Sequence, residues 1–113
     1  PMTLRQKAAN RLAKKYLSSA KKNLEKKETF YDSLERALHN YLKAKLHIVT
    51  AEFSKNRITN LLKEKEIEPV VIKEFVALLE ACEAARYSPE TAVSMEENFD
   101  RASMLISKID KQL

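Results

Sequence analysis

The chain has no glycine among its 113 residues and only three prolines. Glycine supplies the positive φ angles that tight β-hairpin turns require, and the chain has no Asn-Gly or Asp-Gly pair to close such a turn. It is rich instead in Ala, Leu, Glu and Lys, whose side chains lose little conformational freedom in a helix. The composition therefore predicts an all-α fold, and the length suits a single compact domain.

Apolar spacing and helix-start signals divide the chain into about five helices. The first covers 4–27 and has a narrow apolar stripe at intervals of four, made of Leu4, Ala8, Leu12, Tyr16, Ala20 and Leu24. The second opens at Thr29, the expected N-cap. Its wider stripe consists of Phe30, Tyr31, Leu34, Leu38, Tyr41, Leu42 and Leu46. We therefore expect a bundle formed by 28–113, preceded by a long helix that continues into it.

Later boundaries follow from breaks in the helical period. Residues 47–53 are expected to form an extended connector, and Ser54 to cap a short third helix with Ile58, Leu61 and Leu62 facing inward. After a turn at 65–68, Pro69 starts the fourth helix. Its inward residues are Val71, Ile72, Phe75, Leu78, Leu79 and Cys82. The fifth helix begins at Ser88-Pro89-Glu90, and its stripe is Met95, Phe99, Ala102, Ile106, Ile109 and Leu113.

Charge is distributed unevenly along the chain. Residues 1–27 hold nine Lys or Arg against a single acid, Glu25, which gives a net charge of +8. Residues 28–113 hold 12 basic and 15 acidic side chains, a net charge of −3. The basic block needs an anionic partner, and nucleic acid, a phospholipid headgroup layer and an acidic protein all qualify on charge alone.

The residue types that perform catalysis or bind metals show no productive pattern. Without glycine no phosphate-binding loop can form, and no Cys or His cluster has metal-ligand spacing. His39 and His47 are eight residues apart, about 80° from each other on one helix, so we expect two separate, partly exposed histidines. Cys82 lies on an apolar face, where a buried thiol is expected rather than a nucleophile. We predict no enzymatic activity, no catalytic residue, no cofactor and no metal site.

No segment is suited to crossing a bilayer. The longest apolar run, Phe75–Leu79, is far shorter than the roughly 18 to 20 residues of a membrane span. A single cysteine fits a reducing compartment. The start at Pro1-Met2, without the apolar core of a signal peptide, suggests a soluble piece excised from a longer protein.

Two stretches carry a more specific pattern. Residues 30–46 read FYDSLERALHNYLKAKL and residues 78–89 read LLEACEAARYSP, with FSKN at 53–56 and LLKEK at 61–65 between them. In this order and spacing they resemble the C-terminal cytoplasmic domain of the BatD family, the Bacteroides aerotolerance or oxygen-tolerance proteins, over about residues 12–110. Two places depart from the family pattern. Glu66 stands where the family commonly has a Gly in a turn, and His39 and Asn40 replace its usual Trp or Gly.

What the resemblance implies is architectural: an exported region, one transmembrane helix, and then this domain on the cytoplasmic face of a bacterial inner membrane. Partners of such proteins are MoxR-type AAA+ ATPases and von Willebrand factor A domain membrane proteins, so a non-enzymatic docking or scaffold role is implied. The membrane-proximal basic residues would be Lys14, Lys15, Lys21, Lys22, Lys26 and Lys27. We expect part of the partner surface at Arg86, Tyr87, Ser88 and Pro89. The alternative for these four residues is a plain helix cap with Tyr87 packed into the core.

Two other functions are alternatives to docking. A short helix, a turn and the helix 69–85 faintly suggest a DNA-binding helix-turn-helix. The second of these helices, however, has Lys73 as its only basic residue and carries Glu74, Glu80 and Glu83, which disfavours contact with phosphates. A small enzyme or a redox sensor that uses Cys82 would require that thiol to be accessible.

Overall fold

The computed structural model describes residues 4–24, 26–48, 54–87 and 92–113. Within these residues there are six α-helices, one short 3-10 helix and no strand, which confirms the all-α prediction. The helices are α1 (Leu4–Tyr16), α2 (Ser18–Lys22), α3 (Lys27–Leu46), α4 (Lys55–Glu64), α5 (Pro69–Ala84), the 3-10 helix η1 (Ala85–Tyr87) and α6 (Ala92–Gln112). The Cα radius of gyration is 13.6 Å. A compact domain of this size is expected to have about 13 Å.

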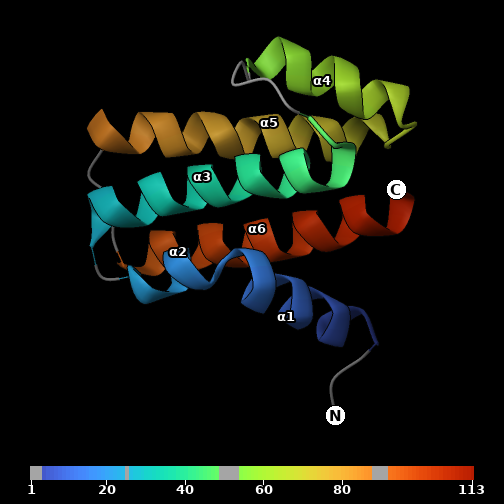
Figure 1. The fold of residues 1–113 in the computed structure, drawn as a ribbon. Coiled ribbons are helices and arrows are strands. Elements are labelled where there is room, and N and C mark those ends of the chain that lie inside the picture. The colour runs from blue at the N-terminus through green and yellow to red at the C-terminus, as the bar shows by residue number, and fades with distance from the viewer. Residues whose placement is uncertain (1–3, 25, 49–53, 88–91) are drawn as a thin grey trace.

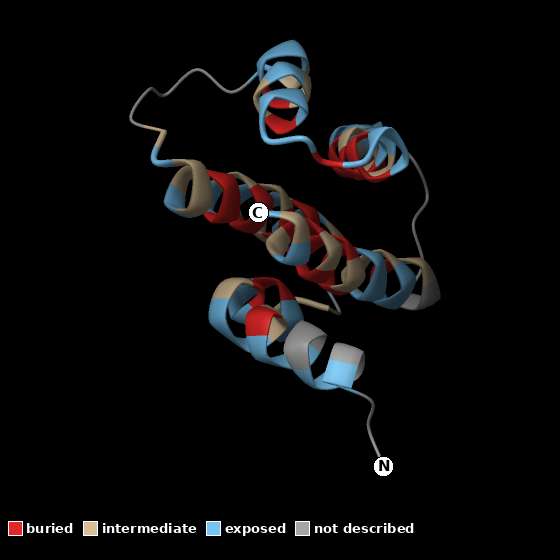
Figure 2. Ribbon diagram, turned by 90° about the vertical axis from the view of Figure 1, so that its right-hand side faces the viewer, coloured by how far each residue is buried: buried red, intermediate tan, exposed pale blue. Residues whose placement is uncertain are grey.

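Three long helices, α3, α5 and α6, form the centre of the bundle, and α5 runs antiparallel to the other two (Figure 1). Helix α4 packs against α5 on one side of this centre. On the opposite side, α1 packs against α6 and α2 packs against α3. In Figure 2 the buried residues face the spaces between helices, and the outward sides of α4, α1 and α2 are exposed. The first helical segment therefore lies along the bundle instead of projecting from it.

The expected single helix over 4–27 is divided at Leu17, which has φ −109° and ψ 11°. Hydrogen bonds continue on both sides of the bend, from the Leu17 N–H to the Ala13 carbonyl and from the Lys21 N–H to the Leu17 carbonyl. A stripe with a strict spacing of four rotates by about 40° per step around a straight helix. The bend corrects this rotation of the stripe, so Leu17 and Ala20 are both fully buried.

Two of the three predicted helix starts that fall on described residues are confirmed. The Ser54 hydroxyl caps α4 by accepting a 3.1 Å hydrogen bond from the Arg57 N–H, and Pro69 is the first residue of α5. The predicted N-cap at Thr29 is wrong, because α3 begins two residues earlier. Lys26 is its N-cap, without a side-chain hydrogen bond, and the Lys26 carbonyl accepts from the Phe30 N–H. The start expected at Ser88-Pro89-Glu90 lies outside the described residues.

The turn between α4 and α5 places a glutamate in the left-handed region. Glu66 has φ 61°, its N–H donates to the Lys63 carbonyl at 2.9 Å, and the Ile67 N–H donates to the Leu62 carbonyl at 3.1 Å. These two hydrogen bonds define a Schellman motif, in which glycine is the preferred residue at the position of Glu66. The helix is thus closed as a glycine would close it, at a cost in backbone strain.

The buried residues form one cluster that draws on all six helices. The six inward residues predicted for α5 are all buried, as are Ile58 and Leu62 of α4. Leu4 and Leu113 are wrong as core residues, since 85% and 45% of their surfaces are exposed at the ends of the chain. Five other residues that were expected to face inward are only partly buried, namely Tyr16, Leu24, Leu46, Leu61 and Phe99. The buried side chains that the stripes missed are Leu17, Ala37, Ile67, Ala85, Ser103, Leu105 and Ser107.

Candidate interaction surfaces

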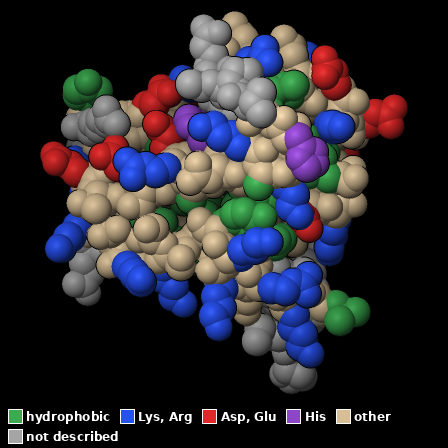
Figure 3. All heavy atoms as spheres, in the orientation of Figure 1, with side chains coloured by type: hydrophobic (Ala, Val, Ile, Leu, Met, Phe, Trp, Pro, Cys, Tyr) green, Lys and Arg blue, Asp and Glu red, His purple; other side chains and the backbone are tan. Residues whose placement is uncertain are grey.

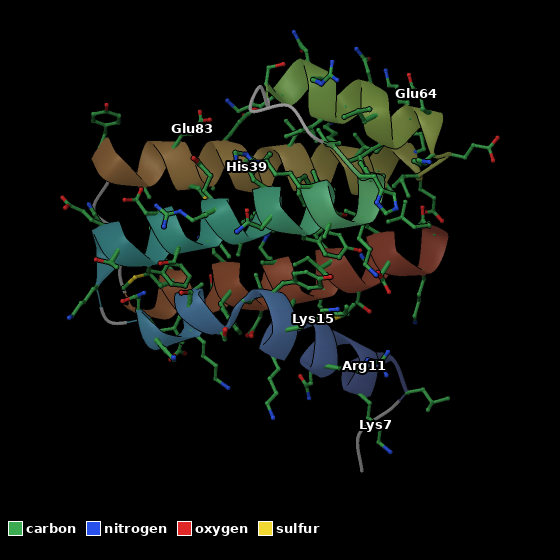
Figure 4. All side chains as sticks on the ribbon, viewed as in Figure 1. Lys7, Arg11, Lys15, His39, Glu64 and Glu83 are labelled. Atoms are coloured by element: carbon green, nitrogen blue, oxygen red, sulfur yellow. The ribbon has the colours of Figure 1, made fainter. Side chains whose placement is uncertain are left out.

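The basic residues of α1 and α2 lie on the outer side of the bundle. In α1, Lys7, Arg11, Lys14 and Lys15 fall within an arc of about 100°, whose centre lies roughly 110° around the helix from the buried Leu12. Figure 4 shows Lys7, Arg11 and Lys15 following one another along the helix. In Figure 3 Lys and Arg gather along the edge formed by α1 and α2, while most of the visible Asp and Glu lie toward α3, α4 and α5. We call the exposed residues Lys7, Arg11, Lys14, Lys15, Lys21 and Lys22 the basic face.

Charge on the basic face is not neutralised within the described part of the chain. The ion pairs found there join Lys45 to Asp110, Lys55 to Glu83 and Lys108 to Glu74. None of them involves α1 or α2. Lys15 makes a different contact, with its Nζ 5.3 Å from the centre of the Tyr16 ring. An uncompensated set of cations on one side of the molecule is a surface that attracts anions.

An open groove of about 940 Å³ borders the basic face, between α1 and α2 on one side and α6 on the other. The wall formed by α1 and α2 contains Lys14, Lys21 and Lys22, together with Asn10, Ala13 and Ser18. The α6 wall is formed by Phe99, Asp100, Ser103 and Met104. The groove therefore brings together three of the six membrane-proximal lysines expected from the sequence, beside a mostly apolar lining.

The other three lysines of that set are placed differently. Lys15 lies in the last turn of α1, outside the groove lining. Lys26 is the N-cap of α3 and Lys27 is its first residue, after the turn that follows α2. Lys7 and Arg11, which the sequence-based set omitted, belong to the basic face. The regular interval of four along Lys7, Arg11 and Lys15 was the signal that could have identified them.

The expected partner surface near the end of α5 is described only in part. Tyr87 is 90% exposed, so the alternative that places its ring in the core is wrong. The 3-10 helix η1 follows α5 directly and contacts α3, and its Ala85 is buried. Ser88, Pro89 and the side chain of Arg86 lie outside the described residues.

A small pocket of about 290 Å³ lies between α3, α4 and α5. Most of its lining residues are polar, and they are His39, Ser54, Lys55, Asn56, Leu79 and Glu83. Lys55 donates to Glu83 at 2.8 Å. Figure 4 shows His39 on the side of α3 that faces Glu83. Burial lowers the pKa of His39, while the charges of Glu35 and Glu83 act in the opposite direction. His47 lies beyond the end of α3 in a left-handed cap, so the two histidines are apart, as expected.

The remaining chemical groups suit a structural role. Cys82 is 2% exposed, and burial raises the pKa of its thiol to about 12, which keeps it protonated and unreactive at neutral pH. Nowhere in the described part of the chain do three or more His, Cys, Asp or Glu side chains gather into a set that could hold a metal ion. Among the described helices, none combines the length and apolar character needed to cross a bilayer.

The chain matches no protein-family model, no curated protein and no solved structure.

Proposed function

We propose that this chain is a non-enzymatic docking domain whose basic face rests on an anionic membrane surface, while the rest of the bundle binds a protein partner. The observation that carries the proposal is the set of exposed cations on α1 and α2 that no described acidic side chain neutralises. Each Lys or Arg near an anionic bilayer contributes about 1 kcal/mol. Several such residues on one side are enough to orient a small domain.

The position of Leu4 supports a membrane over other anionic partners. It is 85% exposed at the start of α1, and its place on the helix is on the same side as Lys7 and Arg11. With the basic face against lipid phosphates, Leu4 is placed to insert into the headgroup layer, where interfacial helices bury their apolar side chains. In Figure 1 this end of α1 lies at the outer edge of the bundle, so the surface can approach a flat membrane.

Nucleic acid remains the less favoured partner. Helices α4 and α5 are joined by a turn, but Lys73, Glu80 and Glu83 are the charged residues that α5 fully exposes. Net negative charge on a would-be recognition helix opposes contact with phosphates.

The protein partner of the bundle, as the resemblance of this chain to BatD proteins implies, would be a MoxR-type ATPase or a von Willebrand factor A domain protein. Tyr87 is the exposed side chain best placed for such a contact.

The experiment is co-sedimentation of the chain with vesicles of phosphatidylglycerol and phosphatidylcholine, compared with phosphatidylcholine alone. Neutralising Lys7, Arg11 and Lys15 to Gln should weaken binding to the anionic vesicles by about 3 kcal/mol, roughly 100-fold. The matched control neutralises Arg57, Lys63 and Lys65, which are exposed on or next to α4 on the opposite side of the bundle. Equal loss in the two triple variants would contradict an oriented membrane surface. Stronger retention on duplex DNA than on vesicles, at about 0.15 M salt, would favour the nucleic-acid alternative.

A further inference from the structure

The groove between α1–α2 and α6 has walls of different chemistry. On one wall, Lys14, Lys21 and Lys22 extend into solvent, and Ser18 adds a hydroxyl group. On the other wall, Phe99 and Met104 are partly buried and face Ala13 across the groove lining. A ligand that fills this space needs an anionic group at one side and an apolar body at the other.

We propose that the groove binds a single anionic phospholipid of the bilayer, with its phosphate held by Lys14, Lys21 and Lys22 and the start of one acyl chain lying on Ala13, Phe99 and Met104. The proposal rests on the membrane function proposed above and names a specific site within it. Its volume of about 940 Å³ is within the usual range for pockets that bind small ligands, roughly 300 to 1,000 Å³.

Charge complementarity determines where the headgroup lies. Three lysines on the α1–α2 wall face one acid, Asp100, on the α6 wall, so the groove carries a net charge of +2. No ion pair between Asp100 and these lysines is found among the described residues, so the lysines are available to an outside anion. Asp100 repels a phosphate from the α6 wall and thereby favours the lysine side. The acyl chain of the lipid, which follows the phosphate, then lies on the apolar lining.

The size of the α6 wall argues against a partner helix in the same groove. Residues 99–104 extend only about 8 Å along α6 at 1.5 Å per residue. A docked amphipathic helix is about 10–12 Å wide with its side chains and makes contacts over several turns. This wall is long enough for a headgroup and the first part of an acyl chain.

The groove extends across the bend at Leu17. Ala13 and Lys14 precede the bend, and Lys21 and Lys22 follow it, yet all four line one groove. Because Leu17 is fully buried, the bend is fixed by core packing. Spacings of seven and eight residues keep Lys14, Lys21 and Lys22 within about 100° of one another around the helix, so the three lysines reach one ligand position on both sides of the bend.

The test uses the full chain and a phospholipid that stays monomeric in water, dihexanoyl-phosphatidylglycerol, with dihexanoyl-phosphatidylcholine and inorganic phosphate as comparisons. Binding is followed by NMR shifts of the Met104 methyl group. We expect saturable binding of one phosphatidylglycerol per chain and at least tenfold weaker binding of the other two compounds. Neutralising Lys14, Lys21 and Lys22 to Gln should weaken it at least tenfold. Neutralising Lys7, Arg11 and Lys15 removes the same charge outside the groove and should change it less than threefold.

Two further variants test the apolar half without altering charge. Ala13→Phe should fill the groove and abolish binding of the monomeric lipid, and Met104→Gln, which keeps the side-chain length, should weaken it severalfold if Ala13→Phe disturbs folding. Absence of saturable lipid binding, with vesicle binding intact, would overturn the groove site and leave the membrane function standing. Loss of vesicle binding as well would contradict both. Equal binding of inorganic phosphate, or tighter binding of an acidic amphipathic helical peptide at Met104, would also overturn the lipid assignment.

Discussion

Tyr41 joins three helices of the core through one side chain. It is fully buried, its hydroxyl donates to Asp110 Oδ1 at 3.0 Å, and Lys45 Nζ lies 3.0 Å from the same oxygen. Its ring meets that of Tyr16 edge to face, with centroids 5.1 Å apart. Among the described side chains, no buried nitrogen or oxygen lacks a hydrogen-bond partner. Tyr41 therefore links α3 to α6 through its hydroxyl and to α1 through its ring. Because the hydroxyl is hydrogen-bonded, its burial carries no energetic penalty.

Replacing Tyr41 by Phe should lower stability and change its pH dependence. The lost hydrogen bond to a carboxylate should cost about 1–2 kcal/mol near pH 7. Burial, and then the charge of Asp110, raise the pKa of Tyr41 in the folded chain above its usual 10.0. The folded state therefore holds this proton more tightly than the unfolded state, so the contribution is fully present below pH 10 and is lost as the pH rises above it.

Urea unfolding of the wild type and of Tyr41→Phe, between pH 7 and 11, measures this difference. The wild type should lose stability more steeply above pH 10 than the variant. Cys82, whose pKa is also raised, contributes equally to both chains and cancels in the comparison. Parallel pH profiles would mean that the hydroxyl ionises as it does in the unfolded chain.

At the level of single residues, the sequence predicted burial better than it predicted partners. Cys82 and Tyr41 were placed inward from helical spacing alone, because a period of 3.6 depends only on local geometry. The link from Tyr41 to Asp110 spans 69 residues and could not be read from any local pattern. Ile67 was missed for a related reason, since a turn residue has no helical phase to reveal that it is buried.

Helix ends were predictable where one residue carries the signal. Ser54 and Pro69 act through their own hydroxyl and ring, so their roles survive in the folded chain. Thr29 has the same chemistry as an N-cap but lies inside α3. There the backbone already turns at Asn23 and Lys26, whose N–H groups donate to the carbonyls of Ala20 and Asn23, so helix can form before Thr29 is reached.

The end of α4 offers a sharp prediction. Glu66→Gly should raise stability by about 0.5–1 kcal/mol, because glycine adopts the φ of 61° without the steric cost that a Cβ imposes. The gain is smaller than the strain removed, since glycine also increases the freedom of the unfolded chain. Thermal and urea unfolding measure the change directly.

Lys65→Gly is the matched control for this turn. Lys65 precedes Glu66 but has φ −86°, where glycine gives no relief and only adds entropy to the unfolded state. It should destabilise the chain by several tenths of a kcal/mol to about 1 kcal/mol. A Glu66→Gly variant that is less stable than wild type would mean that the Glu66 side chain makes a favourable interaction that outweighs its backbone strain.

On the scale of the whole molecule, the charge division was visible in the sequence and the groove was not. Counting residues located the basic block because charge needs no three-dimensional information. The groove combines residues 10–22 with residues 99–104, and it exists only because α1 and α2 pack on α6. The same packing brings Leu12, Leu17 and Ala20 into the core, whereas the sequence suggested a basic helix leading into a bundle at 28–113.

Leu17→Ala tests whether α1, α2 and the long helices unfold as one unit. Leu17 is fully buried in the common cluster, so removing its three terminal carbons should cost about 2–5 kcal/mol. Leu4→Ala is the matched control, the same substitution at a site that is 85% exposed, and it should change stability by no more than about 0.5 kcal/mol. Urea unfolding followed by circular dichroism should show one transition for each chain, shifted strongly only for Leu17→Ala. A near-zero effect of Leu17→Ala on the main transition, or a separate early transition, would mean that 28–113 folds without the first two helices and that they rest on it only loosely.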